Sequence, residues 1–121
     1  VVLFGCGGDR DKTKRPIMGA IAAKLADFVI VTSDNPRTED PNEIIKEIVS
    51  GMKGTHTPHA VIENRPKAIA YAIDNHMAGD IIILAGKGHE DYQIIGREKH
   101  HMDEREIVAE HLKARAEKKE K

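Results

Sequence analysis

Four polar segments of this chain carry the residue types that bind charged small molecules, and each follows an apolar run. They are GCGGDRDKTKR (5–15), SDNPR (33–37), ENR (63–65) and AGKGHEDY (85–92). Their glycines let a backbone approach a ligand closely, and their arginine, lysine and carboxylate side chains make charge-assisted hydrogen bonds. Such a set can hold phosphate, carboxylate or ammonium groups. We therefore take these segments as the candidate binding site.

The first segment crowds basic side chains at the start of a helix that is expected to open at Pro16. The cations are Arg10, Lys12, Lys14 and Arg15. Each opposes the positive end of the helix dipole, at a cost of about 0.3–1 kcal/mol. An anion held there by backbone N–H groups and basic side chains would offset that cost. The alternative is a solvated charge run that Asp9 and Asp11 partly neutralise. We expect an anion site over residues 8–15.

The second segment is only partly explained by helix formation. Asp40 followed by Pro41, with Glu43 three residues after Asp40, predicts an N-cap, a helix-opening proline and a capping box. Starting a helix does not require the preceding Asp-Asn-Pro-Arg of residues 34–37. That stretch therefore indicates binding, unless it is an ordinary turn.

Two familiar motifs are incomplete in this chain. GCGGDR begins like a dinucleotide-binding fingerprint, but Arg10 stands where its third glycine belongs. AGKGHE is not a phosphate-binding P-loop, because Gly88, and not serine or threonine, follows Lys87. His100 and His101 are neighbours on an expected strand and point to opposite faces, which makes a poor chelate. We assign no metal site.

The elements that must position these segments alternate along the chain. Strands are predicted in the β-branched runs VVLF (1–4), FVIVT (28–32), AVI (60–62) and IIILA (81–85). Three sets at helical spacing predict apolar helix faces: Ile17, Met18, Ile21, Ala22 and Leu25; Ile44, Ile45, Ile48, Val49 and Met52; Ile69, Ala72, Ile73 and Met77. Each helix is expected to open at a proline: Pro16, Pro41 or Pro66.

This alternation predicts an α/β fold, with a Rossmann-like, mostly parallel sheet and helices on both of its faces. A β-hairpin turning near Gly96–Arg97 should follow. The last helix should be capped by Asp103 with Glu106 and should carry Ile107, Val108 and Leu112. Ligands of open parallel sheets bind outside the carboxyl ends of the strands, where all four polar segments should meet. The opposite edge, with KLAD (24–27) and MAGD (77–80), has few residues of the types that bind a charged ligand.

Composition limits the classes of function. The 121 residues predict a single domain, and a net charge of −1 with 32% charged residues gives no field that would attract nucleic acid or membrane. The lone Cys6 excludes an internal disulfide and suits the cytoplasm. No signal peptide or apolar span is present. Because the chain starts inside an apolar run without methionine, we expect a piece of a longer protein with a truncated first strand.

Three motifs together resemble one family over essentially the whole chain. GCGGDRDKTKRP, SDNPR and AGKGHEDYQ, in this order and near these spacings, closely resemble the C-terminal domain of the Mur ligases that add diaminopimelate as the third amino acid of the peptidoglycan stem peptide. One departure is Thr13, where the family often has glycine. Threonine argues against a required positive φ at that position and leaves the assigned roles intact.

The resemblance implies a three-domain enzyme whose other domains, absent from this chain, hold ATP, Mg²⁺ and most of the UDP-N-acetylmuramoyl-dipeptide. ATP phosphorylates the dipeptide's carboxylate, and the amine of meso-diaminopimelate attacks the acyl phosphate. This domain would bind diaminopimelate and close the active site. We expect the chain alone to be an inactive monomer that requires no cofactor.

The resemblance also implies roles for individual residues. Those expected to contact diaminopimelate are Arg10, Asn35, Arg37, Gly86 and Glu90, with Asp34 shaping the loop. Lys12 would contact the transferred phosphoryl group, while the roles of Lys14 and Arg65 stay open. The chemistry fits, because a planar guanidinium suits the distal carboxylate of diaminopimelate and an acid suits its ammonium. Taken singly, Glu90 also fits a surface acid, and Gly86 and Gly88 a tight bend.

Two other classes remain as alternatives. One is a free-standing nucleotide- or phosphometabolite-binding α/β domain, which the glycines and the basic loop permit. The other is a receiver-like interaction module, which needs acids after the first and third strands. We rank the module last, because Asp9 and Asp11 stand among four basic residues.

Overall fold

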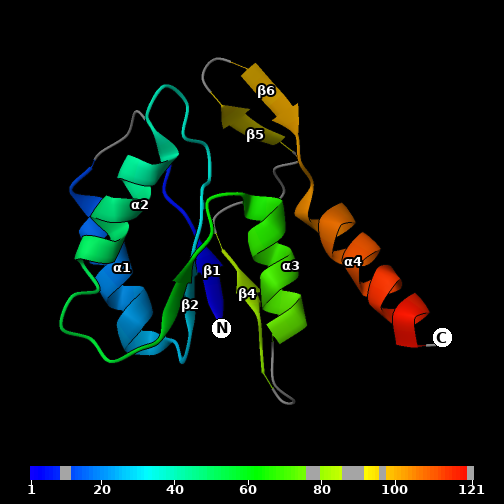
Figure 1. The fold of residues 1–121 in the computed structure, drawn as a ribbon. Coiled ribbons are helices and arrows are strands. Elements are labelled where there is room, and N and C mark those ends of the chain that lie inside the picture. The colour runs from blue at the N-terminus through cyan, green and yellow to red at the C-terminus, as the bar shows by residue number, and fades with distance from the viewer. Residues whose placement is uncertain (9–11, 76–79, 86–91, 96–97, 120–121) are drawn as a thin grey trace.

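Four short strands form one parallel sheet in the computed structural model, which describes residues 1–8, 12–75, 80–85, 92–95 and 98–119. The strands β1 (Val2–Phe4), β2 (Val29–Val31), β3 (His59–Val61) and β4 (Ile83–Leu84) lie in the order β3-β2-β1-β4 (Figure 1). All three pairings are parallel, and Leu3 lies opposite both Ile30 and Leu84. Three strands fall inside predicted apolar runs, and β3 begins one residue before its run, so the parallel sheet is confirmed.

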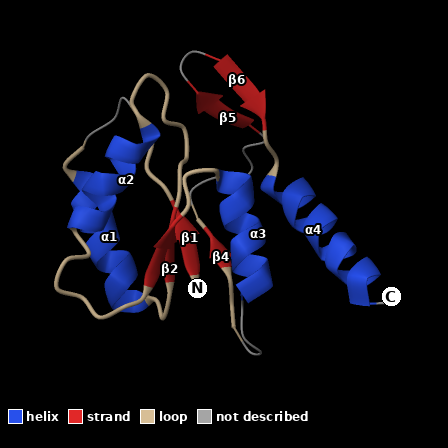
Figure 2. Cartoon of the chain, viewed as in Figure 1, coloured by secondary structure: helices blue, strands red, loops and turns tan. Residues whose placement is uncertain are grey.

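Helices cover both faces of the sheet (Figure 2). On one face lie α1 (Lys14–Leu25) and α2 (Pro41–Ser50); on the other lies α3 (Arg65–Asn75), with α4 (Glu104–Lys119) packed beside it. Successive strand residues point to opposite faces, so Phe4 packs with the α2 residues Ile44 and Ile48, and Leu3 packs with Ile69 of α3. The predicted α/β class with two helical layers is confirmed. No helix in the described part of the chain has the length and apolar character needed to span a membrane.

The predicted hairpin is also present. Strand β5 (Tyr92–Ile95) pairs antiparallel with β6 (Glu98–His101), while the predicted turn at 96–97 lies outside the described residues. The hairpin stands at the carboxyl-end edge of the sheet (Figure 1). Asp103 then caps α4, accepting a hydrogen bond from the backbone N–H of Arg105 at 2.9 Å. The side-chain hydrogen bond from Arg105 also lowers the pKa of the Asp103 carboxyl.

The three prolines lie in the first turns of their helices, as predicted. Pro41 is the first residue of α2, and the Asp40 carboxylate caps it by accepting from the backbone N–H of Asn42 at 2.9 Å. Pro66 is the second residue of α3. Helix α1 begins two residues earlier than predicted, so Pro16 is its third residue. First-turn N–H groups have no intrahelical partner, so a proline is tolerated at each position.

The predicted core face of α1 is wrong. The large apolar side chains of this face, Ile17, Met18, Ile21 and Leu25, are exposed, and α1 buries Arg15, Gly19 and Ala23 instead. The reason is close backbone contact with α2: a Cβ on Gly19 would lie 2.1 Å from the Ile48 carbonyl oxygen. Small residues therefore select the packed side of α1. The predicted face of α2 is buried apart from Val49, which is half-buried, and that of α3 is buried apart from Met77, which lies outside the described residues.

A matched pair of substitutions tests this reversal. Ile48→Val removes a methyl group from a fully buried side chain, and we expect the free energy of unfolding to fall by about 0.5–1.5 kcal/mol. Ile21→Val removes the same group from a helix position that is 52% exposed, and we expect a change within about 0.5 kcal/mol. Urea unfolding followed by circular dichroism measures both. Equal losses would mean that the α1 face is buried.

Candidate functional site

The loops after β1 and β2 are joined directly at the carboxyl-end edge of the sheet. The backbone N–H of Gly8 donates to the Asn35 carbonyl at 2.7 Å, and Nη1 of Arg37 donates to the Gly8 carbonyl at 3.0 Å. A Cβ on Gly8 would lie 1.7 Å from the Pro36 carbonyl oxygen, so only glycine allows this approach. The glycine-rich segment thus brings the backbone of the first loop against the SDNPR loop (33–37).

Arg37 has an unusual backbone conformation. Its φ of 53° lies in the left-handed region, where it is the sole non-glycine residue among those described. Its Nη1 also donates to the Asn35 carbonyl at 3.3 Å, and the N–H of Glu39 donates to the Pro36 carbonyl at 3.0 Å. Strained conformations of this kind persist where surrounding contacts hold them, and they cluster at ligand sites. The half-buried guanidinium is therefore presented from a fixed loop.

The loop after β3 is hydrogen-bonded to the first residue of the SDNPR loop, Ser33. The Ser33 hydroxyl donates to the Glu63 carbonyl at 2.7 Å, and the Ser33 N–H donates to the same oxygen at 3.3 Å. Thr32 adds a third hydrogen bond to this carbonyl, from Oγ1 at 3.2 Å. The loops that follow β1, β2 and β3 are therefore linked along one edge, as the parallel topology predicted.

Arg65 joins the ends of three elements. Its guanidinium is fully buried and donates to the Ser33 carbonyl at 3.2 Å, to the Ala85 carbonyl at 2.9 Å and to the Glu104 carboxylate at 2.8 Å. Ser33 follows β2, Ala85 follows β4 and Glu104 begins α4. The role of Arg65, open from the sequence, is to connect these segments. Arg65 lies four residues before Ile69 and seven before Ala72, which places it on the buried face of α3. This spacing is the feature of the sequence from which a structural role could have been inferred.

Gln93 of β5 fixes the SDNPR loop from the hairpin side. Its Nε2 donates to the Ser33 hydroxyl at 2.9 Å and to the Asp34 carbonyl at 2.6 Å. The side chain is buried. This glutamine is the last residue of the AGKGHEDYQ motif, and no pattern in the sequence indicates a role for it.

Two of the four basic residues near the start of α1, Arg15 and Lys12, lie close to acids, while Arg10 lies outside the described residues. Arg15 is buried and donates to Glu39 at 2.9 and 3.0 Å, to Glu47 at 2.8 Å and to the Gly7 carbonyl at 3.0 Å. The hydrogen bond from Arg15 to Glu39 is the main reason that the pKa of Arg15 rises above its ordinary value. Lys12 is exposed, with Nζ 3.8 Å from Glu39. Arg15 therefore has a structural role, and the anion site stays a prediction.

Cys6 lies in the same first loop but is not available for chemistry. It is buried, with Sγ 3.6 Å from the Met18 sulfur, and burial raises the pKa of its thiol. A thiol with a raised pKa carries little thiolate near neutral pH, so we assign no reactive role to Cys6.

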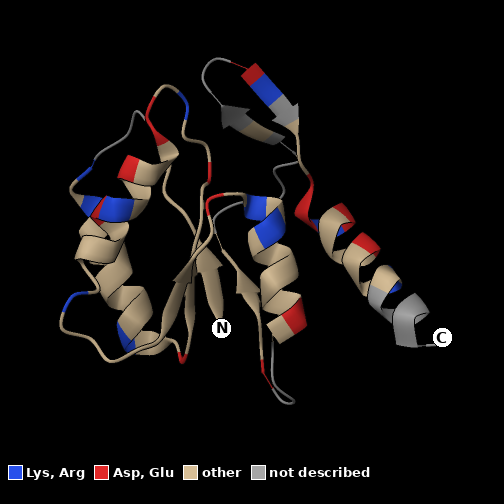
Figure 3. Cartoon of the chain, in the orientation of Figure 1, with Lys and Arg blue, Asp and Glu red and all other residues tan. Residues whose placement is uncertain are grey.

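The structure brings together part of the predicted site. Asp34, Asn35 and Arg37 lie in one loop, with Asn35 buried and the other two half-buried. Arg10, Gly86 and Glu90 lie outside the described residues, so their contacts stay predictions. Charged residues gather at the carboxyl-end edge, at the starts of α1, α2 and α3, whereas β1 to β4 carry none (Figure 3).

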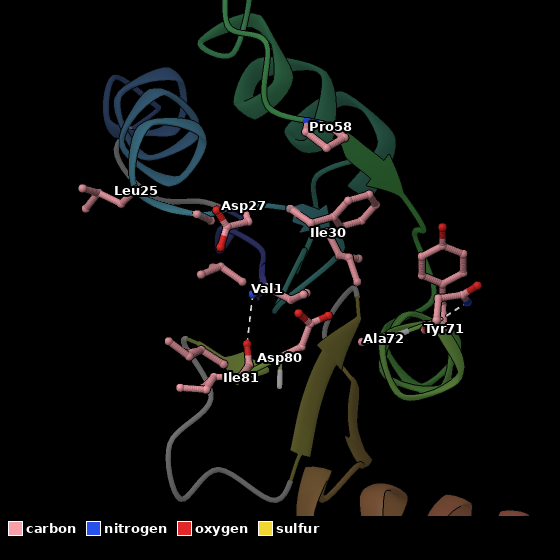
Figure 4. A pocket seen from close by; sticks show the side chains of 14 residues that line it. Val1, Leu25, Asp27, Ile30, Pro58, Tyr71, Ala72, Asp80 and Ile81 are labelled. Atoms are coloured by element: carbon pink, nitrogen blue, oxygen red, sulfur yellow. Dashed lines mark hydrogen bonds between the residues drawn. The ribbon is translucent and has the colours of Figure 1, made fainter. Parts of the chain in front are cut away.

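A pocket of about 750 Å³ lies at the opposite edge of the sheet (Figure 4). Its lining includes Val1, Leu25 and Ile81, and the amino group of Val1 donates to the Ile81 carbonyl at 2.9 Å. The described side chains that line it include Asp27 and Asp80 but no lysine or arginine. Because no lysine or arginine side chain is among these lining residues, the candidate site for a charged ligand remains at the carboxyl-end edge.

The chain is similar to known proteins over most of its length. Residues 1–88 match the family model described as Mur ligase, glutamate ligase domain. The UDP-N-acetylmuramoyl-L-alanyl-D-glutamate–2,6-diaminopimelate ligase of Caldanaerobacter subterraneus is 60% identical over 112 residues, which cover 93% of this chain and 23% of that protein. The protein named ligase 1 of this type in Clostridium acetobutylicum is 56% identical over 113 residues, again 93% of this chain and 23% of that protein.

A solved structure supports the same relationship. It is titled as a UDP-N-acetylmuramoyl-L-alanyl-D-glutamate–2,6-diaminopimelate ligase, and it matches 95% of this chain with a TM-score of 0.88 at 43% identity. The match covers 24% of that chain. This chain therefore spans about a quarter of the length of the relatives it matches.

Proposed function

Because the chain belongs to the Mur ligase family, matching its glutamate ligase domain, we propose that it is the C-terminal, amino-acid-binding domain of a three-domain ligase. The complete enzyme joins meso-diaminopimelate to UDP-N-acetylmuramoyl-L-alanyl-D-glutamate during peptidoglycan synthesis. The names of the relatives support this substrate pair. The observation that carries the proposal is the SDNPR loop, fixed by Gly8, which presents Arg37 in a left-handed conformation at the carboxyl-end edge.

Diaminopimelate has two amino-acid ends, and the domain must hold one while the other reacts. The distal carboxylate takes a hydrogen-bonded pair from the guanidinium of Arg37, with Asn35 as a second donor. Arg10 and Gly86 complete the contacts, Asp34 shapes the loop, and Glu90 receives the distal ammonium. The amine at the other end then attacks the glutamyl acyl phosphate. A C–N bond forms, the amine loses a proton, and inorganic phosphate leaves.

ATP and Mg²⁺ belong to the other domains of the complete ligase. This sequence contains no P-loop, and in the described part of the chain no three His, Cys, Asp or Glu side chains come together as metal ligands would. The residues of this chain thus do not fit an ATP–Mg²⁺ site of its own. Lys12 is exposed beside the candidate site, with its ammonium 3.8 Å from the Glu39 carboxylate, and in this proposal it contacts the transferred phosphoryl group. We place the enzyme in the cytoplasm, where ATP is available.

The activity is tested on the complete protein that carries this chain. It is incubated with UDP-N-acetylmuramoyl-L-alanyl-D-glutamate, ATP, Mg²⁺ and either meso-diaminopimelate or lysine. Mass spectrometry of the nucleotide product and phosphate release are measured together. We expect product that has gained one diaminopimelate residue, with one phosphate released per product. Absence of this product under conditions that support ATP turnover with another amino acid would refute the proposed substrate.

The 121-residue chain alone is expected to be inactive. It has no P-loop to bind the ATP phosphates, so neither ATP turnover nor amide formation should exceed the blank without enzyme. The same coupled phosphate assay checks this, with the complete protein as the positive control. Steady ATP turnover by the chain, lost when Lys12 and Lys14 are replaced by alanine, would favour the alternative of a free-standing nucleotide-binding domain.

A further inference from the structure

The β5–β6 hairpin forms a two-stranded sheet of its own beside the candidate site. In the part of the chain that the structure describes, β5 and β6 pair with each other and not with the four-stranded sheet. Side-chain contacts therefore help to set the hairpin's position relative to the SDNPR loop. Gln93, in the middle of β5, makes two such contacts, to Ser33 and to Asp34.

The two contacts have a defined direction. The Ser33 hydroxyl donates its proton to the Glu63 carbonyl, so toward Gln93 it acts as an acceptor. The Asp34 carbonyl can only accept. Gln93 must therefore supply two N–H donors at one point, and a neutral primary amide does this without bringing a charge into a buried site. A carboxylate of the same shape would face two acceptors.

The contact lies next to the residues that are proposed to bind the substrate. The Asp34 carbonyl belongs to the peptide that leads into Asn35, and Arg37 follows two residues later in its left-handed conformation. Gly8 holds this loop from the side of the first loop, and Gln93 holds it from the hairpin side. Without the contacts of Gly8 or those of Gln93, we expect the loop to relax, because a left-handed backbone is unfavourable for an arginine unless surrounding contacts stabilise it.

We propose that Gln93 is a positioning residue for the diaminopimelate site, acting through the Asp34–Asn35 peptide to keep Asn35 and Arg37 in binding geometry. This inference rests on the proposed function. It assigns the hairpin a specific task, which is to set the shape of the loop that holds the distal carboxylate. Displacements of about 1 Å in such supporting contacts can lower rates by about 10²-fold.

The test uses Gln93→Met and Gln93→Glu in the complete ligase. Methionine keeps the length of the side chain and removes both donors, and glutamate keeps the shape and replaces the donors with acceptors. We expect KM for diaminopimelate to rise and kcat/KM to fall by about 10- to 100-fold in both variants. The preference for diaminopimelate over lysine should also fall. The KM values for ATP and the UDP-linked dipeptide should stay unchanged.

Thr57→Val is the matched control. It removes a side-chain hydrogen bond, from Thr57 to the Ala23 carbonyl, away from the candidate site. Melting temperatures are recorded for all variants, and Thr57→Val should keep the wild-type KM for diaminopimelate even where its melting temperature falls. A purely structural role for Gln93 would change all substrates alike, and that result would overturn the inference.

Three further outcomes would decide against either the positioning role of Gln93 or the proposed function. Folded Gln93 variants with the wild-type KM for diaminopimelate and the wild-type preference would refute the positioning role while leaving the proposed function standing. A wild-type complete protein that adds no diaminopimelate would refute the proposed function first. If neither Gln93 variant folds, the residue is structural and the inference is wrong.

Discussion

Replacing Arg37 with alanine in the complete ligase is expected to lower kcat/KM for diaminopimelate by about 10³- to 10⁴-fold. A site built to hydrogen-bond a group discriminates strongly, because its own polar groups are left unpaired when the partner is missing. Diaminopimelate carries a distal carboxylate and lysine does not. The variant should therefore keep whatever low activity the enzyme has with lysine, and its preference between the two should collapse.

The conservative variant sharpens this expectation. Arg37→Lys keeps the positive charge but replaces a planar fork with a single ammonium, which cannot pair bidentately with a carboxylate. The ammonium also has no second arm to bond the Gly8 carbonyl while it faces the substrate. We expect Arg37→Lys to recover at most a small part of the lost activity.

The measurement is kcat/KM for both amino acids, with melting temperatures alongside. Arg105→Ala is the control, because Arg105 is an exposed arginine that pairs with Asp103 within its own helix start. It should leave both activities unchanged. If Arg37→Ala lowers the melting temperature but keeps the preference for diaminopimelate, Arg37 serves the loop and not the substrate.

The fold was predictable because local patterns and topology agree in this chain. Short β-branched runs alternate with helical periods, and a parallel sheet with crossover helices is the arrangement that buries both. Leu3 and Phe4 illustrate this, since each enters a different half of the core. Proline and aspartate marked the start of α2 correctly, because capping depends on the nearest few residues.

The face of α1 was not predictable from periodicity. Ile17, Ile21 and Leu25 have the spacing of a core face, yet Gly19 sets the packing by allowing the backbone of α1 to meet that of α2. Hydrophobic spacing identifies a helix and its apolar stripe, but close backbone contact can outweigh the stripe in choosing which side is packed. That choice depends on the partner helix, which the local sequence does not contain.

The sequence predicted the SDNPR loop as part of the candidate site, but not the contacts that support this loop. Arg37 and its neighbours stand out because their types suit a charged ligand. Gln93 lies sixty residues from Ser33 in the chain, and its role depends on a contact that only the folded molecule makes. The left-handed φ of Arg37 was missed for the same reason, since Gly8 supplies the contacts that hold it.

The second large effect is expected at the arginine that connects these supports. Arg65→Met should lower the free energy of unfolding by about 3–5 kcal/mol, because it leaves the Glu104 carboxylate without its cation. Arg65 is fully buried and Glu104 is nearly so. The Ser33 and Ala85 carbonyls lose donors as well. A loss of this size is a large fraction of the roughly 5–15 kcal/mol that holds a typical domain folded.

A double-mutant cycle tests this account of Arg65. Glu104→Met alone should also be strongly destabilising, because it leaves the guanidinium buried without its anion. The double variant Arg65→Met/Glu104→Met should then cost less than the sum of the single variants, since no uncompensated charge remains. Urea unfolding followed by circular dichroism measures the cycle. Lys67→Met, at an exposed position two residues along the same helix, is the control and should stay within about 0.5 kcal/mol. Strictly additive losses would show that the ion pair between Arg65 and Glu104 contributes nothing. Arg65 would then stabilise the fold only through the hydrogen bonds from its side chain to the Ser33 and Ala85 carbonyls.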